Sequence, residues 1–95
     1  MNTQEARALL DRAMAGYHIE SYGALQRLLR QPDRSTVTGP SGVRYQLVVE
    51  ALWDAAPGGL LRLIGSIDDG GLRAFAPLSA DLLVAPDGTF VGERP

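Results

Sequence analysis

The side chains of this sequence that can do acid–base or metal chemistry are few and lie apart from one another. Asp68 and Asp69 are the only adjacent carboxylates, and such a pair can move protons or bind a cation. They also begin the sequence Asp-Asp-Gly-Gly, which a tight turn favours, without the alternating acids of a calcium loop. His18 is the single histidine, and no acidic residue completes a recognisable ligand set with it. We therefore expect a turn at the two aspartates and a capping or packing role for His18.

The nine basic residues of the chain are all arginine. The absence of lysine excludes Schiff-base chemistry and the phosphate-binding loop that needs a lysine. Arg27, Arg30 and Arg34 can line one side of a helix and its exit and contact phosphate. However, Asp33 interrupts them and no set of stacking aromatic residues accompanies them. A solvated helix face is the simpler explanation, and nucleic-acid binding through these arginines is kept as an alternative function.

The elements that must position these residues are two helices followed by an antiparallel sheet. The chain of 95 residues is long enough for one domain and too short for two, and its 45% hydrophobic and 21% charged residues are ordinary for a globular protein. Of its eleven Gly and six Pro, only Gly16 and Gly23 precede Pro32. Because glycine and proline mark turns, we expect an α+β fold in a single domain, 1–95. Its helical head covers 1–31 and its antiparallel β-meander covers 35–92.

Two helices are expected in the head. Asn2 and Glu5 have the spacing of a capping box, and a stripe of apolar residues at helical spacing follows them: Ala6, Leu9, Leu10, Ala13 and Met14. Gly16 suits the end of this helix. The second helix begins with Ser21 as its N-cap and ends before Pro32, because the residue preceding a proline is disfavoured in a helix.

Alternating apolar and polar residues predict the strands of the β body. The clearest run is Val43–Trp53, after which Pro57-Gly58-Gly59 turns the chain into a second strand, Leu60–Asp68. Asp69-Gly70 is the sequence that a two-residue hairpin prefers. The remaining strands are expected at Ser35–Thr38, Leu72–Ala76, Leu82–Ala85 and Thr89–Val91, the last two joined around Pro86-Asp87-Gly88.

The strand register assigns each side chain to one of two sheet faces. Pairing Trp53 with Leu61, and Ile67 with Leu72, gathers most large apolar side chains on one face, with the small residue Gly65 among them. We expect the two helices to pack on this face. The opposite face also receives apolar side chains together with arginines, and its candidate interface residues are Val48, Leu52, Arg62, Ile64, Arg73 and Phe75.

The apolar part of that opposite face needs a cover, because a solvated face does not require so many large apolar groups together. One explanation is that the C-terminal hairpin folds over it within the same chain, through Leu83, Val84 and Phe90. The other is that a partner protein or a second copy of the chain covers it, with an apolar centre and an arginine rim. The sequence favours neither explanation over the other.

One segment of the chain carries a family resemblance. The run GSIDDGGLRAFAPLSADLLVAPDGTFVGE, from Gly65 to Glu93, resembles part of a family of small uncharacterised bacterial proteins and covers about a third of the chain. The resemblance implies a compact domain. It implies no activity and no site residue.

The function that these observations favour is a non-enzymatic protein-interaction module, such as a homodimer, that acts through the apolar patch and uses no cofactor or metal. One alternative is the nucleic-acid-binding or regulatory role of the N-terminal arginines. Another is a small ligand-binding domain whose helix–sheet pocket is lined by Tyr17, Tyr22, Tyr45 or Trp53. The chain has no cysteine, no export signal and no apolar run near the roughly 18 residues that span a bilayer. We therefore expect it in the cytoplasm, away from membranes.

Overall fold

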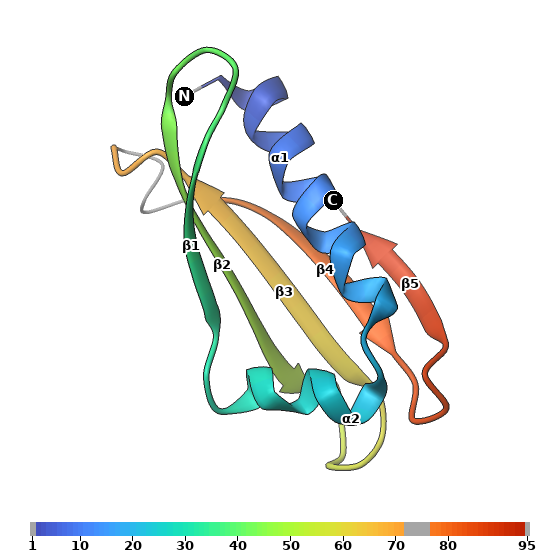
Figure 1. Cartoon of the computed structure of the whole chain (residues 1–95). Coiled ribbons are helices and arrows are strands. Elements are labelled where there is room, and N and C mark those ends of the chain that lie inside the picture. The colour runs from blue at the N-terminus through green and yellow to red at the C-terminus, as the bar shows by residue number, and fades with distance from the viewer. Residues whose placement is uncertain (1, 72–76, 95) are drawn as a thin grey trace.

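The computed structural model describes residues 2–71 and 77–94 of the chain. The helical elements are α1 (Thr3–Ala15) and α2 (Tyr22–Leu25), followed by the short 3-10 segments η1 (Gly16–Ile19) and η2 (Gln26–Leu29), respectively. The strands are β1 (Asp33–Thr38), β2 (Arg44–Trp53), β3 (Leu61–Asp68), β4 (Leu78–Val84) and β5 (Phe90–Arg94). The predicted α+β fold is confirmed, with the helices first and an antiparallel sheet after them (Figure 1).

Both helices begin where their caps were expected. The Asn2 side-chain oxygen accepts a hydrogen bond from the Glu5 amide at 3.1 Å, and the Ser21 hydroxyl accepts one from the Ala24 amide at 3.1 Å. Each cap satisfies a backbone donor that has no partner inside its helix. No helix within 2–71 and 77–94 has both the length and the apolar content needed to cross a membrane.

The sheet is a meander in which every strand pairs antiparallel with its neighbours in the chain, in the order β1-β2-β3-β4-β5. The predicted pairing of Trp53 with Leu61 is confirmed. The predicted pairing of Ile67 with Leu72 is wrong, because Ile67 pairs with Leu78. The connection between β3 and β4 therefore spans residues 69–77 and is not a two-residue hairpin. The predicted strand Leu72–Ala76 lies outside the described residues.

Two features explain this longer connection. The side chains of Asp68 and Asp69 accept hydrogen bonds from the amides of Gly70 and Gly71, at 2.8 and 3.1 Å, so they form two successive local turns. In addition, the residues of β4 alternate between the two faces of the sheet, and the apolar side chains on the helix side are all covered only when the whole strand is paired. Its apolar residues at every second position lie buried or half-buried on the helix side of the sheet: Leu78, Ala80, Leu82 and Val84.

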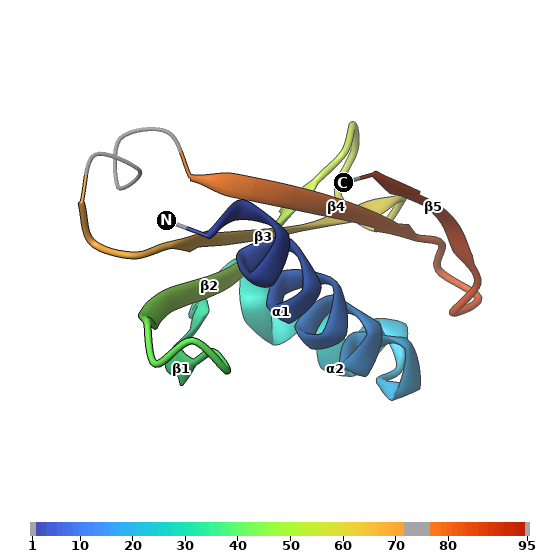
Figure 2. The same ribbon diagram turned by 90° about the horizontal axis from the view of Figure 1, so that it is seen from above.

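The hydrophobic core lies between the helices and one face of the sheet (Figure 2). Tyr45 and Leu63 have no exposed surface, and Leu10 of α1 is equally buried above them. Helix α1 packs closest over Gly65, where an added side chain would collide with Met14 and Leu10. The expectation that the helices cover this face is confirmed.

The C-terminal hairpin extends the sheet and does not fold over it. Strand β5 pairs with β4 through Val84 and Phe90, and both side chains belong to the core on the helix side. Of the two explanations that the sequence left open, the one in which Leu83, Val84 and Phe90 cover the opposite face does not hold. The physical reason is the alternation of β4, which buries Val84 toward the helices only when Leu83 points to the other face.

Candidate interaction surface

The sheet has one face against the helices and one face turned away from them (Figure 2), here called the second face. Its side chains form rows across β2, β3 and β4, which follow from the strand register. One row runs from Glu50 through Ile64 to Asp81, and a neighbouring row runs from Leu52 through Arg62 to Leu83. Figure 2 shows both labelled helices on the other side of the sheet, so no described helix covers these rows.

Four of the six predicted interface residues lie together on the second face. Val48 and Leu52 flank Glu50 on β2, while Ile64 and Arg62 are neighbours on β3. Leu52 is 42% exposed, whereas Val48 and Ile64 are half-buried by neighbouring side chains. The other two predicted residues, Arg73 and Phe75, lie outside the described residues. Val48, Leu52, Ile64 and Leu83 together are called the apolar patch.

Leu83 and Asp81 are two second-face residues that the sequence-based prediction did not assign there. One of the two explanations left open by the sequence placed Leu83 on a hairpin above the face, but Leu83 lies within the face, directly opposite Arg62. Val91, next to the bulge between β4 and β5, is 57% exposed. The sequence signal for Asp81 and Leu83 was the alternation of apolar residues from Leu78 to Val84. This alternation predicts a single strand in which the residues between the apolar ones point to the second face.

Arg62 lies at one side of the apolar patch, directly between Leu52 and Leu83, and its charge is balanced there by two aspartates. Its guanidinium donates to Asp54 at 2.6 Å and to Asp81 at 2.6 Å. These hydrogen bonds, first that to Asp54 and then that to Asp81, raise the pKa of Arg62 above its ordinary value. The patch therefore contains a paired cation, which suits a contact surface better than a free charge would.

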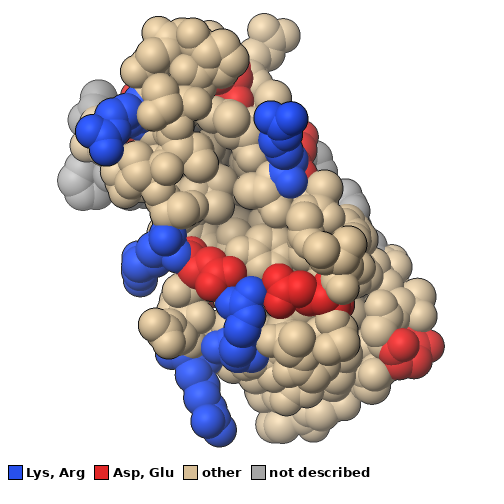
Figure 3. Space-filling model, in the orientation of Figure 1, with Lys and Arg blue, Asp and Glu red and all other residues tan. Residues whose placement is uncertain are grey.

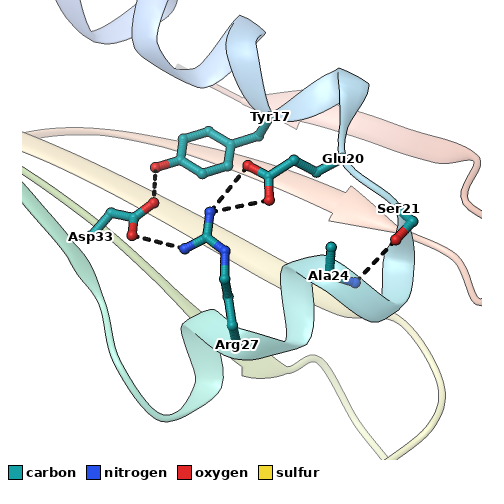
Figure 4. Close-up of polar contacts among 6 residues, drawn as sticks. All are labelled: Tyr17, Glu20, Ser21, Ala24, Arg27 and Asp33. Carbon is teal, nitrogen blue, oxygen red and sulfur yellow. Dashed lines mark hydrogen bonds and ion pairs between the residues drawn. The ribbon is translucent and has the colours of Figure 1, made fainter.

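A separate polar cluster ties the helical head to the edge of the sheet (Figure 4). Arg27 of η2 donates to Asp33 of β1 at 2.8 Å and to both oxygens of Glu20 at 3.1 Å, while the Tyr17 hydroxyl donates to Asp33 at 2.7 Å. The bonds from Arg27 and then Tyr17 lower the pKa of Asp33. Burial and the bond to Asp33 raise the pKa of Tyr17. Arg27 is thus committed to structure and is not a free phosphate contact.

The remaining arginines of that group lie nearby. Basic and acidic side chains meet in the middle of the helix side, and further basic side chains gather over η2 and the start of β1 (Figure 3). Arg30 and Arg34 are exposed, and within residues 2–71 and 77–94 neither guanidinium makes a hydrogen bond or ion pair.

Glu5 joins the first turn of α1 to the turn between β1 and β2. Its carboxylate accepts hydrogen bonds from the Ser41 amide at 2.8 Å, the Ser41 hydroxyl at 2.6 Å and the Tyr45 hydroxyl at 2.7 Å. The bonds from Ser41 and then Tyr45 lower the pKa of Glu5. Burial and the Glu5 carboxylate together raise the pKa of Tyr45 to about 12.

The lowered pKa values of Glu5 and Asp33 predict how the free energy of unfolding depends on pH. A carboxyl whose pKa is lowered by folding adds stability above its unfolded pKa, and that stability is lost as the pH falls through the folded pKa. For Glu5 and Asp33 the ordinary values are 4.5 and 3.8, and both folded values are lower. We therefore expect urea unfolding to show steady stability from about pH 7 to 5 and a decline below about pH 4.5.

The Glu5→Gln variant tests the origin of that decline. An amide cannot take over all three accepted bonds, so this variant is expected to be less stable at pH 7 and to lose less stability between about pH 5 and 3 than wild type. Glu50→Gln removes an exposed carboxylate from the second face and should keep the wild-type pH dependence. Equal pH dependence in all three proteins would contradict the role given to Glu5.

The other residues singled out by their chemistry have ordinary structural surroundings. The His18 Nδ1–H donates to the Ala15 carbonyl oxygen at 3.1 Å, and the centroid of its ring lies 4.4 Å from that of Phe90. The hydroxyls of Tyr17, Tyr22 and Tyr45 donate to Asp33, the Gly59 carbonyl and Glu5, respectively. Across the described part of the chain, no three His, Asp or Glu side chains come together as a metal site.

Comparisons with known proteins add no relative to this description. No protein-family model, curated protein or solved structure matches the chain. The resemblance of Gly65–Glu93 to a family of small bacterial proteins therefore stays a prediction.

Proposed function

We propose that this chain is a non-enzymatic protein-interaction module that self-associates through the second face of its sheet. The observation that supports this function is the apolar patch, which occupies the three central strands and is covered by no described helix or hairpin. An antiparallel sheet with one solvated face normally alternates apolar residues inward and polar residues outward. The patch departs from that rule at four positions.

The composition of the second face also resembles that of an interface. Its apolar side chains alternate with Glu50, Arg62 and Asp81 across the three strands, and Arg62 is already paired with Asp54 and Asp81. Interfaces likewise combine apolar side chains with polar groups whose charges are paired. Removing the patch from water gains roughly 25 cal/mol for each Å² of apolar surface.

A second copy of the chain is the partner that the charges favour. Along the second face, β2 begins with Arg44 and is followed directly after its last residue by Asp54. Two copies packed with their β2 strands antiparallel bring each Arg44 toward Asp54 of the other copy. The Oδ1 atom of Asp54 accepts from Arg62, but its Oδ2 atom accepts no hydrogen bond from the described residues. A symmetric dimer of this kind uses one self-complementary surface, which is the commonest arrangement among oligomers.

The alternatives have less support from the contacts. A nucleic-acid surface needs several unopposed cations, but Arg27 is paired with Glu20 and Asp33. A ligand pocket lined by tyrosines needs free hydroxyls, but those of Tyr17 and Tyr45 are bonded within the chain. The proposed module works without a cofactor, and the absence of cysteine suits the reducing cytoplasm.

Nuclear magnetic resonance of a mixed sample tests the proposal directly. Isotopically labelled and unlabelled copies are mixed at high concentration, and only contacts between different copies are recorded. We expect such contacts from the methyl groups of Leu52, Ile64 and Leu83, because these would meet across the dimer. Intermolecular contacts that come from the helix side instead, or a protein that stays monomeric at millimolar concentration, would refute the proposed function.

A further inference from the structure

The β1 edge of the sheet is a second surface with features of a binding site. Strand β1 pairs with β2 on one side only, through six residues in unbroken register. A six-residue edge strand leaves about three N–H and three C=O groups without a strand partner. Ser35 and Thr36 in its middle are exposed.

The two edges of the sheet differ in how they are protected. Natural sheets blunt their edges with bulges, prolines or lysines, because a regular edge accepts another strand. The β5 edge carries a bulge in its pairing with β4 at Leu83 and Val84. The β1 edge has no bulge, and no proline lies between Asp33 and Thr38. Of the two, β1 is the edge that can accept a further strand.

The surroundings of β1 provide places for side chains at both of its ends. At its start lies an open hollow of about 790 Å³, lined by Arg30 and Arg34 among others. Beyond its end lies an open hollow of about 670 Å³ between α1 and the following turn, with Ala8, Leu9 and Pro40 in its wall. The first hollow offers two cations that have no partner among the described residues, and the second offers an apolar wall.

We infer that β1 binds an extended acidic peptide, which adds to the sheet as a further strand. The main-chain groups of β1 would hold the peptide backbone, and alternate side chains of the peptide would enter the hollows, as in other cases of strand addition. The hollows are separated by the length of β1, about 17 Å for six residues. The peptide therefore carries an acidic residue beside Arg30 and Arg34 and an apolar residue about five positions away.

Charge decides between this peptide and other occupants of the edge. A second copy of β1 brings only one acidic residue, Asp33, and that carboxylate is already bonded to Arg27 and Tyr17. A second copy of β1 would therefore provide no partner for Arg30 or Arg34. A nucleic acid has the right charge but no backbone N–H groups in the spacing of a strand, so it would leave the edge of β1 unused.

The test uses an eight-residue fluorescent peptide with two aspartates at one end and alternating threonine and valine along the rest. We expect it to bind the full chain and to slow amide exchange in β1. The double variant Arg30→Ala/Arg34→Ala, and a peptide with lysines in place of the aspartates, should each weaken binding at least tenfold. Arg44→Ala removes an exposed arginine of the neighbouring strand that does not line the first hollow, and this control should leave peptide binding unchanged. A peptide N-methylated at alternate residues should lose binding, because strand addition needs its amides.

Several outcomes would overturn the inference. Binding that leaves β1 exchange unchanged, or that is indifferent to N-methylation, would exclude strand addition. Protection of β1 that appears without peptide as protein concentration rises would assign the edge to a second copy. An oligonucleotide of equal charge that binds with the same dependence on Arg30 and Arg34 would point to nucleic acid. The inference does not depend on self-association, since Ile64→Arg should abolish the dimer and leave peptide binding intact.

Discussion

Replacing Ile64 with arginine is expected to abolish self-association and leave the monomer folded. Ile64 is at the centre of the apolar patch, and truncating or charging a central anchor of an interface costs about 2 kcal/mol or more. This corresponds to a dissociation constant at least thirtyfold weaker. Within the monomer, the new guanidinium would lie between the cross-strand neighbours Glu50 and Asp81, which offer it opposite charge.

Sedimentation over a wide concentration range, together with circular dichroism, measures both parts of this result. The control is Ala24→Arg, which adds the same charge at an exposed position of α2 on the helix side. This control should associate like wild type. If Ile64→Arg instead unfolds the chain, the patch belongs to the core of the monomer. If both variants and wild type are equally monomeric, the second face is not a self-association surface.

Replacing Gly65 with valine is expected to destabilise the fold more than any surface change. Gly65 lies in β3 directly beneath α1, where a Cβ atom would overlap the Met14 sulfur and crowd Leu10. The Met14 and Leu10 side chains must change conformation, or the helix must move away from the sheet, because a packed core has little free volume for the added methyl groups. Inserting this bulk costs about 3 kcal/mol, a large part of the stability of a domain of this size.

Thermal unfolding is the measurement, with an expected fall in Tm of roughly 10–20 °C. The matched control is Ser66→Val, which places the same side chain at the next residue of β3, on the second face. Valine suits a half-exposed strand position, so this control should change the free energy of unfolding by less than about 0.5 kcal/mol. Similar losses of stability in the two variants would show that α1 does not pack against Gly65.

The parts of the fold that depend on neighbouring residues were predictable from the sequence. Asn2 and Ser21 cap their helices through amides three residues away. Alternation predicted β2 and β3, and the short Pro-Gly-Gly turn between them left one register, with Trp53 opposite Leu61. Caps, periodicity and tight turns act within a few residues, so the sequence expresses them directly.

The pairing of β4 was not predictable in the same way. Asp68 and Leu78 are separated along the chain by more residues than a tight turn contains, so turn geometry alone does not fix the register of β4. The pairing was decided by which alignment buries Leu78, Leu82 and Val84 under the helices. That comparison involves α1, β3 and β4 together, and no local pattern contains it.

Some residues of the candidate surface were predictable from local sequence patterns, and others depended on the tertiary structure. The sequence alone determined that Val48, Leu52 and Ile64 lie on the face away from the helices, because side-chain direction in a strand alternates at every residue. Only the tertiary structure decided that Leu83 joins them and that the C-terminal hairpin leaves them uncovered. It also decided that Arg62 is paired with Asp54 and Asp81. These outcomes depend on contacts between strands far apart in the chain, and such contacts are set by the packing of the whole core.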